Sequence, residues 1–275
     1  MNPNTQRAYQ MSLRSVRNLV GATPLSDASR VIKMIEESKY SINTKKLYYN
    51  AIRKLETLTP EADALYREQM GKHAEKLEAA AQEQTLNEKE KEIFVEWNTI
   101  LQAREKARED AMDVRTWLNY VILSLYTYQP PVRLDYGRMK VVNKHPTDTT
   151  YNYLVWDISR PYFLFQEYKT QDKYKSVQVP IHKELIPILQ VWLDCNLTDW
   201  FLTQENGEPY SENNMSNKIR NLMKQYTGKA AGVSQIRHSY ISYMRQGEAP
   251  LKQQNEIAKQ MLHSVNMSVL YRRIV

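Results

Sequence analysis

Apolar and aromatic side chains recur at helical spacing through the first eighty residues of the chain. One such run covers residues 4–20. Two more, 28–38 and 45–56, each follow a break that carries serine, aspartate, asparagine or threonine, at 24–27 and 41–44. Side chains of this kind cap helix starts, because their oxygens accept backbone N–H groups that have no partner within the helix. The pattern predicts a unit of short helices with lysine and arginine outside, either a DNA-binding unit or a plain bundle with solvated charges.

The middle of the chain, about 72–113, is rich in glutamate, lysine, alanine and glutamine. This composition predicts one or two long, exposed helices and a boundary between two domains. We therefore expect a helical domain over residues 1–90, a helical linker over 91–110 and a second domain over 111–275.

The second half of the chain changes character. A strongly apolar helix is predicted at 114–128 and ends at two adjacent prolines. Strand-like runs follow at 151–158, 162–168 and 175–181, and amphipathic helical runs then continue toward the C-terminus. The predicted fold class is α+β: mainly α-helical with a small antiparallel β-sheet.

The net charge indicates which kind of partner the protein binds, and the cysteine count excludes some kinds of site. The 275 residues carry a net charge of +7, with a pI of about 9.2. This favours a polyanionic partner, although many basic proteins bind no nucleic acid. The single cysteine, Cys195, excludes an internal disulfide framework and a cysteine-rich zinc site. It is predicted to be a small core residue of an amphipathic helix.

Several kinds of motif are missing from the sequence. No apolar run reaches the length of a membrane span, and the first residues lack a secretory core, so an intracellular protein with no membrane partner is expected. We find no Walker loop, no dinucleotide-binding glycines and no zinc-ligand spacing. The sequence therefore predicts chemistry without metal, nucleotide or other cofactor.

Five side chains, in a fixed order along the second half, suit the cutting of a DNA strand. They are Arg133, Lys169, Arg237, His263 and Tyr271. Guanidinium groups bind a phosphodiester and offset its growing charge. A lysine or histidine gives a proton to the departing 5′ oxygen, and a tyrosine attacks phosphorus.

With these residues the chain resembles the tyrosine recombinase (phage integrase) family, from about Thr116 to the end and more weakly over the first hundred residues. The resemblance implies a site-specific recombinase or integrase that cleaves and rejoins double-stranded DNA through a 3′-phosphotyrosine. It also implies a homo-tetramer assembled on DNA, with the helical first half gripping the duplex. The departures described below suggest a virus or mobile element as the source, and a compartment with access to DNA.

The resemblance assigns the first catalytic arginine to Arg133, which follows the stiff double-proline turn. Asp135 stands close by, where the family usually has a glutamate a few residues on, and is expected to orient the guanidinium. Arg138 is an alternative to Arg133, and a surface Arg–Asp pair is the structural alternative.

Lys169 matches the lysine that the family places in a β-turn, here as Lys169-Thr170 between two strand-like runs. Lys173 and Lys175 are close competitors. Basic hairpins also serve as plain phosphate contacts.

Arg237 matches the second arginine of the family's His-x-x-Arg-His segment. Ser234 occupies the place of the His or Lys three residues earlier. A serine is a poor proton carrier at neutral pH, so either the activity is weakened or Lys169 carries the acid role alone. His238 is expected to be structural.

His263 lies in a segment similar to the family's Leu-Gly-His-Ser, with Met-Leu in place of Leu-Gly. Its implied role is a hydrogen bond to a phosphate oxygen or help with the tyrosine proton. Tyr271, the implied nucleophile, follows after eight residues where the family usually shows nine. Other candidate nucleophiles are Tyr226, Tyr240 and Tyr243.

Two other functions fit the same residues. A type IB topoisomerase-like enzyme would use the same chemistry on a single duplex. A catalytically impaired DNA-binding protein would keep the fold, and its lost activity would be marked by Ser234 and by the short spacing from His263 to Tyr271.

Overall fold

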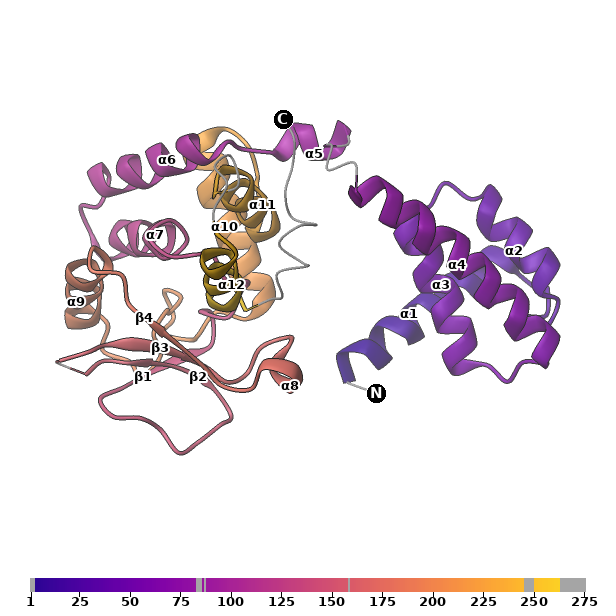
Figure 1. The fold of residues 1–275 in the computed structure, drawn as a ribbon, viewed down its shortest axis with the longest axis horizontal. Helices are drawn as coiled ribbons and strands as arrows, with labels where there is room; N and C mark the ends of the chain where they lie inside the picture. The colour runs from indigo at the N-terminus through magenta and orange to yellow at the C-terminus, as the bar shows by residue number, and fades with distance from the viewer. Residues whose placement is uncertain (1–2, 83–85, 87, 158, 245–249, 263–275) are drawn as a thin grey trace. The chain divides into compact units, whose positions relative to one another are not determined.

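The computed structural model describes residues 3–82, 86, 88–157, 159–244 and 250–262 (Figure 1). The chain divides into two compact units, Met1–Glu83 and Gln84–Val275. Each unit has a hydrophobic core of its own.

The described part of the first unit consists of the helices α1 (Pro3–Val20), α2 (Ala28–Glu37), α3 (Ile42–Leu55) and α4 (Pro60–Gln82). Asp27 caps α2 by accepting the backbone N–H of Arg30 at 3.3 Å. Ser41 caps α3 in the same way, through the N–H of Thr44 at 3.2 Å. Both predicted helix starts are confirmed.

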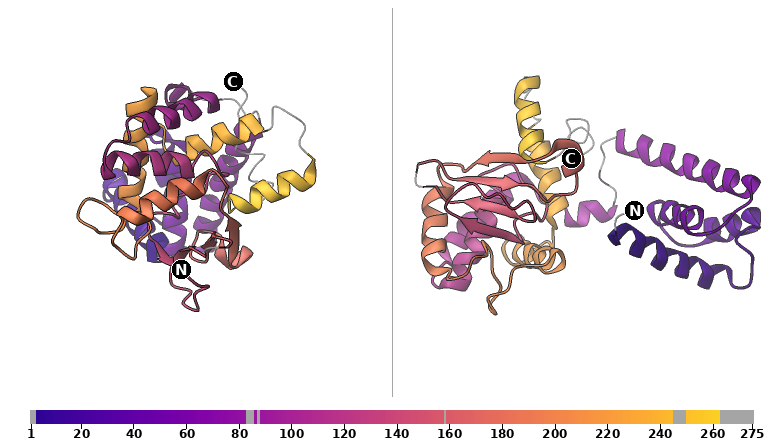
Figure 2. Two further views of the ribbon diagram at one scale, coloured as in Figure 1. Left: turned by 90° about the vertical axis from the view of Figure 1, so that its left-hand side faces the viewer. Right: turned by 90° about the horizontal axis from the view of Figure 1, so that it is seen from below.

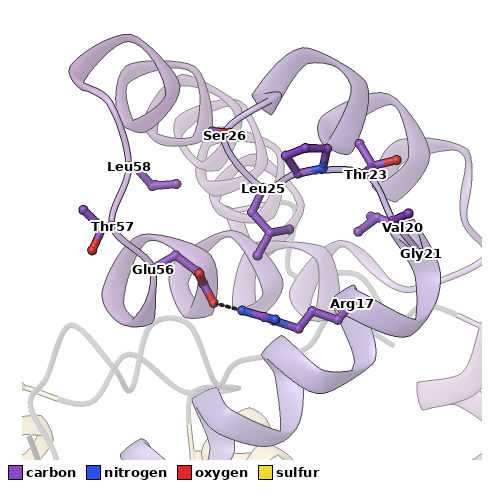
Figure 3. A pocket seen from close by; sticks show the side chains of 11 residues that line it. Arg17, Val20, Gly21, Thr23, Leu25, Ser26, Glu56, Thr57 and Leu58 are labelled. Carbon is purple, nitrogen blue, oxygen red and sulfur yellow. Dashed lines mark hydrogen bonds and ion pairs between the residues drawn. The ribbon is translucent and has the colours of Figure 1, made fainter.

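A pocket of about 350 Å³ lies in the first unit, where the connection from α1 to α2 approaches the end of α3 (Figure 3). Arg17 on α1 forms an ion pair with Glu56, the C-cap of α3, at 2.6 Å. The pair ties the two helices together beside this pocket.

The second unit combines a four-stranded sheet with helices that gather on one face of it (Figures 1 and 2). Its helices are α5 (Glu88–Ile93), α6 (Trp97–Glu109), α7 (Val114–Leu125), α8 (Gln171–Tyr174), α9 (Leu185–Cys195), α10 (Glu212–Thr227), α11 (Val233–Met244) and α12 (Leu251–Gln260). Its strands are β1 (Met139–Val142), β2 (Asn152–Val155), β3 (Tyr162–Phe165) and β4 (Val177–Pro180). No helix in the described ranges is long and apolar enough to cross a membrane.

The sheet is mixed, so the expectation of a purely antiparallel sheet was wrong for one strand pair. The strand order is β1-β2-β3-β4. β2 pairs antiparallel with β3, and β3 with β4, as the three strand-like runs predicted. β1 pairs parallel with β2, from Met139↔Asn152 to Val142↔Val155. β1 was not predicted, because its run Met139–Val142 includes a lysine and directly follows the segment around Arg133.

Two further expectations differ from the structure. The segment 91–110, expected to be a linker, contributes α6 to the second unit, and its apolar side chains at helical spacing (Trp97, Ile100, Ala103 and Ala107) are buried in the core of that unit. Cys195, expected in the core, is exposed at the end of α9. The buried residues of α9 end at Trp192, and Cys195 is the last residue of the helix, beyond them.

Candidate functional site

Arg237 lies in α11 with its side chain fully buried, at 0% relative exposure. Its Nη1 atom donates to the carbonyl oxygen of Pro131 at 2.7 Å and to that of Met261 at 3.2 Å. Pro131 belongs to the turn that precedes Arg133, and Met261 follows α12. One guanidinium therefore joins this turn to the end of α12. A buried charge needs such polar partners, because desolvation otherwise disfavours it strongly.

Arg133 follows the turn and is half-buried. Its Nη1 atom donates to the carbonyl of Leu262 at 3.4 Å, and its own carbonyl accepts a hydrogen bond from the Tyr126 hydroxyl at 2.6 Å. Because Met261 and Leu262 are adjacent, the two arginines converge on neighbouring carbonyls at the C-terminal end of α12. That end of a helix carries partial negative charge, which suits two cations. The next residue in the chain is His263.

Asp135 lies beside both arginines. Burial raises its pKa to about 6, while the charges of Arg133 and Arg237 act in the opposite direction. Its Oδ2 atom accepts the backbone N–H of Arg133 at 3.0 Å. The contact thus fixes the backbone that carries the guanidinium.

Lys169 is exposed in the connection from β3 to β4. The hydroxyl of the next residue, Thr170, donates to the carbonyl of Leu262 at 3.0 Å, which is the carbonyl that the first arginine contacts. The hairpin that carries the lysine is therefore attached where the arginines converge. Lys175, also exposed, ends α8 with a φ of 56°. The side chain of Lys173 lies outside the described residues.

Asn152, at the start of β2, belongs to the same region but has no counterpart among the predicted site residues. Its buried amide donates to the carbonyls of Asp135 at 3.2 Å and Glu167 at 2.8 Å. Its Oδ1 atom accepts the backbone N–H groups of Gln166 at 2.8 Å and Glu167 at 2.9 Å. The only sequence signal was an amide within an otherwise apolar strand.

The remaining candidates lie on α11, just before β1 or outside the described residues. Ser234 is exposed in the first turn of α11, and His238 is half-buried on the same helix. Arg138 is exposed just before β1. His263 and Tyr271 lie outside the described residues.

The alternative tyrosines differ in accessibility. Burial raises the pKa of Tyr240 to about 12, and burial is also the main cause that raises the pKa of Tyr226. Both rings are packed in the core of the second unit, which disfavours the phenolate that attack requires. Tyr243 is 41% exposed.

No protein-family model and no curated protein sequence matches this chain. The structure is similar to solved recombinases. XerA recombinase is 14% identical, with 100% of this chain and 88% of that chain covered and a TM-score of 0.49. XerH bound to its difH substrate in a pre-cleavage complex is 12% identical, with 97% and 85% covered and a TM-score of 0.49.

XerH bound to a palindromic difH substrate, in a post-cleavage complex, is 13% identical, with 89% of this chain and 68% of that chain covered and a TM-score of 0.53. At this identity the likeness shows a shared fold. The expectation drawn from the resemblance to tyrosine recombinases is confirmed at that level: this chain has the fold of the XerH site-specific recombinase.

Proposed function

We propose that this chain cleaves and rejoins DNA strands at specific sites through a covalent bond between Tyr271 and a DNA 3′-phosphate. The observation that supports this most is the convergence of Arg133, Arg237 and the Lys169 hairpin on two adjacent carbonyls at the end of α12. Residues far apart in the sequence meet there.

The arginines have different parts in this proposal. A guanidinium has five N–H donors, and the bond from Arg133 to Leu262 uses one of them. Its fork fits two oxygens of a phosphate, so Arg133 holds the scissile group. Arg237 is buried and acts through its charge, which is weakly screened in such surroundings, and by fixing the turn and the end of α12.

Each P–O bond that forms is matched by one that breaks, so the reaction needs no co-reactant. The phenol oxygen of Tyr271 forms a bond to phosphorus, the bond from phosphorus to the 5′ oxygen breaks, and the electron pair leaves on that oxygen. Lys169 gives this oxygen a proton, and His263 takes the proton of the phenol. Rejoining is the reverse, with a 5′-hydroxyl attacking the phosphotyrosine. Because the covalent link keeps the energy of the phosphodiester, the cycle consumes no nucleotide.

The proposed partner is double-stranded DNA. The net charge of +7 favours it, and the solved XerH chains are bound to their DNA substrates. Recombination of two duplexes cuts four strands, so the active form is proposed to be a tetramer assembled on DNA, with the first unit as a second DNA-binding body. The protein acts wherever its DNA is accessible.

A nicked suicide substrate tests this function. We expect the full chain, incubated with nicked duplexes that carry candidate sites, to give a covalent DNA–protein band on a denaturing gel. Tyr271→Phe removes the hydroxyl that attacks phosphorus, so the band disappears while DNA binding is retained. Tyr243→Phe is the matched control, because it alters an exposed tyrosine of the same unit, and it keeps the band. A band that survives Tyr271→Phe, or binding without any band, contradicts the proposal.

A further inference from the structure

Asn152 is 5% exposed, and its side chain makes four hydrogen bonds to backbone groups. The ladder between β2 and β3 reaches Tyr153↔Leu164. Beyond that pair, the side-chain amide oxygen of Asn152 accepts the backbone N–H groups of Gln166 and Glu167. Both amide hydrogens and the amide oxygen have partners, which a buried amide requires.

The four bonds join two parts of the proposed site. Asp135, whose carbonyl accepts one amide hydrogen, also binds the backbone N–H of Arg133 through its carboxylate. Glu167, which takes part in two of the bonds, stands two residues before Lys169. One amide therefore bridges the segment of the phosphate-binding arginine and the hairpin of the proton-donating lysine.

We propose that Asn152 is a positioning residue for the proton transfer: it sets where Lys169 stands relative to the phosphate that Arg133 holds. This inference rests on the proposed function. Asn152 has no contact with the DNA in this account and acts only through the two backbone segments. Its loss slows the step that needs the lysine and leaves the binding of DNA intact.

Asn152→Asp is the sharpest variant, because it changes almost no volume. The carboxylate still accepts the N–H groups of Gln166 and Glu167. It donates no hydrogen bond, and it faces the carbonyls of Asp135 and Glu167 with a negative charge. The bridge is thus cut on the donor side while the hairpin keeps its two N–H contacts. Asn152→Ser, which keeps a hydroxyl donor, is the second variant in case the first does not fold.

The readout is the single-turnover rate of covalent adduct formation on two suicide substrates, one ordinary and one with sulfur in place of the scissile 5′ oxygen. The pKa of a thiol is about 8.5, whereas that of a hydroxyl such as water is about 16. A thiolate is therefore a good leaving group, and the sulfur leaves without a proton donor. A defect in proton donation is therefore rescued by sulfur, and a general loss of structure is not.

We expect Asn152→Asp to slow cleavage of the ordinary substrate by about 10²-fold, the cost typical of a misplaced catalytic group, and to approach the wild-type rate on the sulfur substrate. Lys169→Ala shows the same rescue, and Arg133→Ala is slow on both substrates. Asn196→Asp is the matched control, since its amide also donates to a backbone carbonyl, that of Trp200 at 2.6 Å, and it retains the wild-type rates.

Equal slowing on both substrates, or no slowing at all, overturns the assignment of Asn152. If Asn196→Asp also slowed cleavage of the ordinary substrate and was rescued by sulfur, the effect would be general, and the assignment of Asn152 would again be overturned. A wild-type chain that forms no adduct with either substrate, or an adduct that persists in Tyr271→Phe, refutes the proposed function itself, so the two failures are distinguishable.

Discussion

Leu262 holds a left-handed backbone conformation, with a φ of 56°, although its side chain is buried. A residue with a Cβ atom gives up roughly 1–2 kcal/mol in this region. The family resemblance places a glycine here, which adopts such angles freely. In this chain the carbonyl of Leu262 accepts hydrogen bonds from both Arg133 and Thr170, so the strained residue lies at the centre of the proposed site.

This strain predicts an unusual order of stability at position 262. Leu262→Ala removes the buried side chain and keeps the strain, at a cost of about 2–5 kcal/mol. Leu262→Gly removes the same side chain and relieves the strain, so we expect it to be more stable than Leu262→Ala by about 1 kcal/mol. Denaturant unfolding of the two variants measures the difference. A glycine variant that is the less stable of the two would contradict the conformation.

Asp135 predicts a dependence of stability on pH. Its pKa is about 6 in the folded chain, against an ordinary value of 3.8, so the folded state binds this proton more tightly. Its contribution is therefore full below pH 3.8 and is lost as the pH rises through about 6. Asp135→Asn removes the titration, so its stability relative to wild type rises between pH 4 and pH 7, by on the order of 2 kcal/mol. Unfolding free energies at both pH values test this, and a constant difference would refute it.

At the residue scale, the sequence predicted only part of the site. The local segments around Arg133, Lys169 and Arg237 were recognisable, and the structure places the two arginines and the lysine hairpin at one helix end. Asn152 was not recognisable, because its partners stand fourteen to seventeen residues away and depend on strand pairing. His263 and Tyr271 remain predictions.

At the scale of elements, α6 belongs to the core of the second unit, and Ile100 on it is 1% exposed. We expect Ile100→Ala to lower the free energy of unfolding by about 2–5 kcal/mol, because it leaves a cavity in that core. The exposed Gln102 on the same helix is the control, and Gln102→Ala stays within about 0.5 kcal/mol of wild type. Equal, small effects of both substitutions would indicate a linker helix after all.

The hairpin between β3 and β4 gives a test of which lysine donates the proton. Lys169→Ala is expected to slow covalent cleavage by about 10²–10⁴-fold, the contribution typical of a general acid. Lys175→Gly is the comparison, since glycine suits the positive φ at that position and only the side chain is lost. Single-turnover rates decide between them: a slow Lys175→Gly with a fast Lys169→Ala would reverse the assignment.

Sequence patterns predicted the elements that lie within strongly apolar runs. The buried helix α7 and the strands β2, β3 and β4 were predicted from apolar runs. β1 was missed, and so was its parallel pairing, because pairing depends on where the connection 143–151 returns the chain. The apolar stripe of α6 was hidden by the charged residues around it.

At the scale of the whole molecule, the net charge of +7 predicts salt-sensitive DNA binding. Each phosphate contact releases a counterion, so the affinity falls steeply with salt, by about 10³-fold between 50 and 200 mM if roughly six phosphates are neutralised. Titrations of a labelled duplex over this range give the slope. An affinity that is independent of salt would contradict binding along the DNA backbone.

The most direct measurement is the identity of the residue that carries the DNA. The full chain is allowed to react with a suicide substrate, the adduct is digested with nuclease and protease, and the peptide that carries the residual nucleotide is located by mass spectrometry. We predict that the nucleotide is on Tyr271, within the C-terminal peptide. A nucleotide on Tyr243 or any other residue, or bound DNA with no modified peptide, would contradict the account.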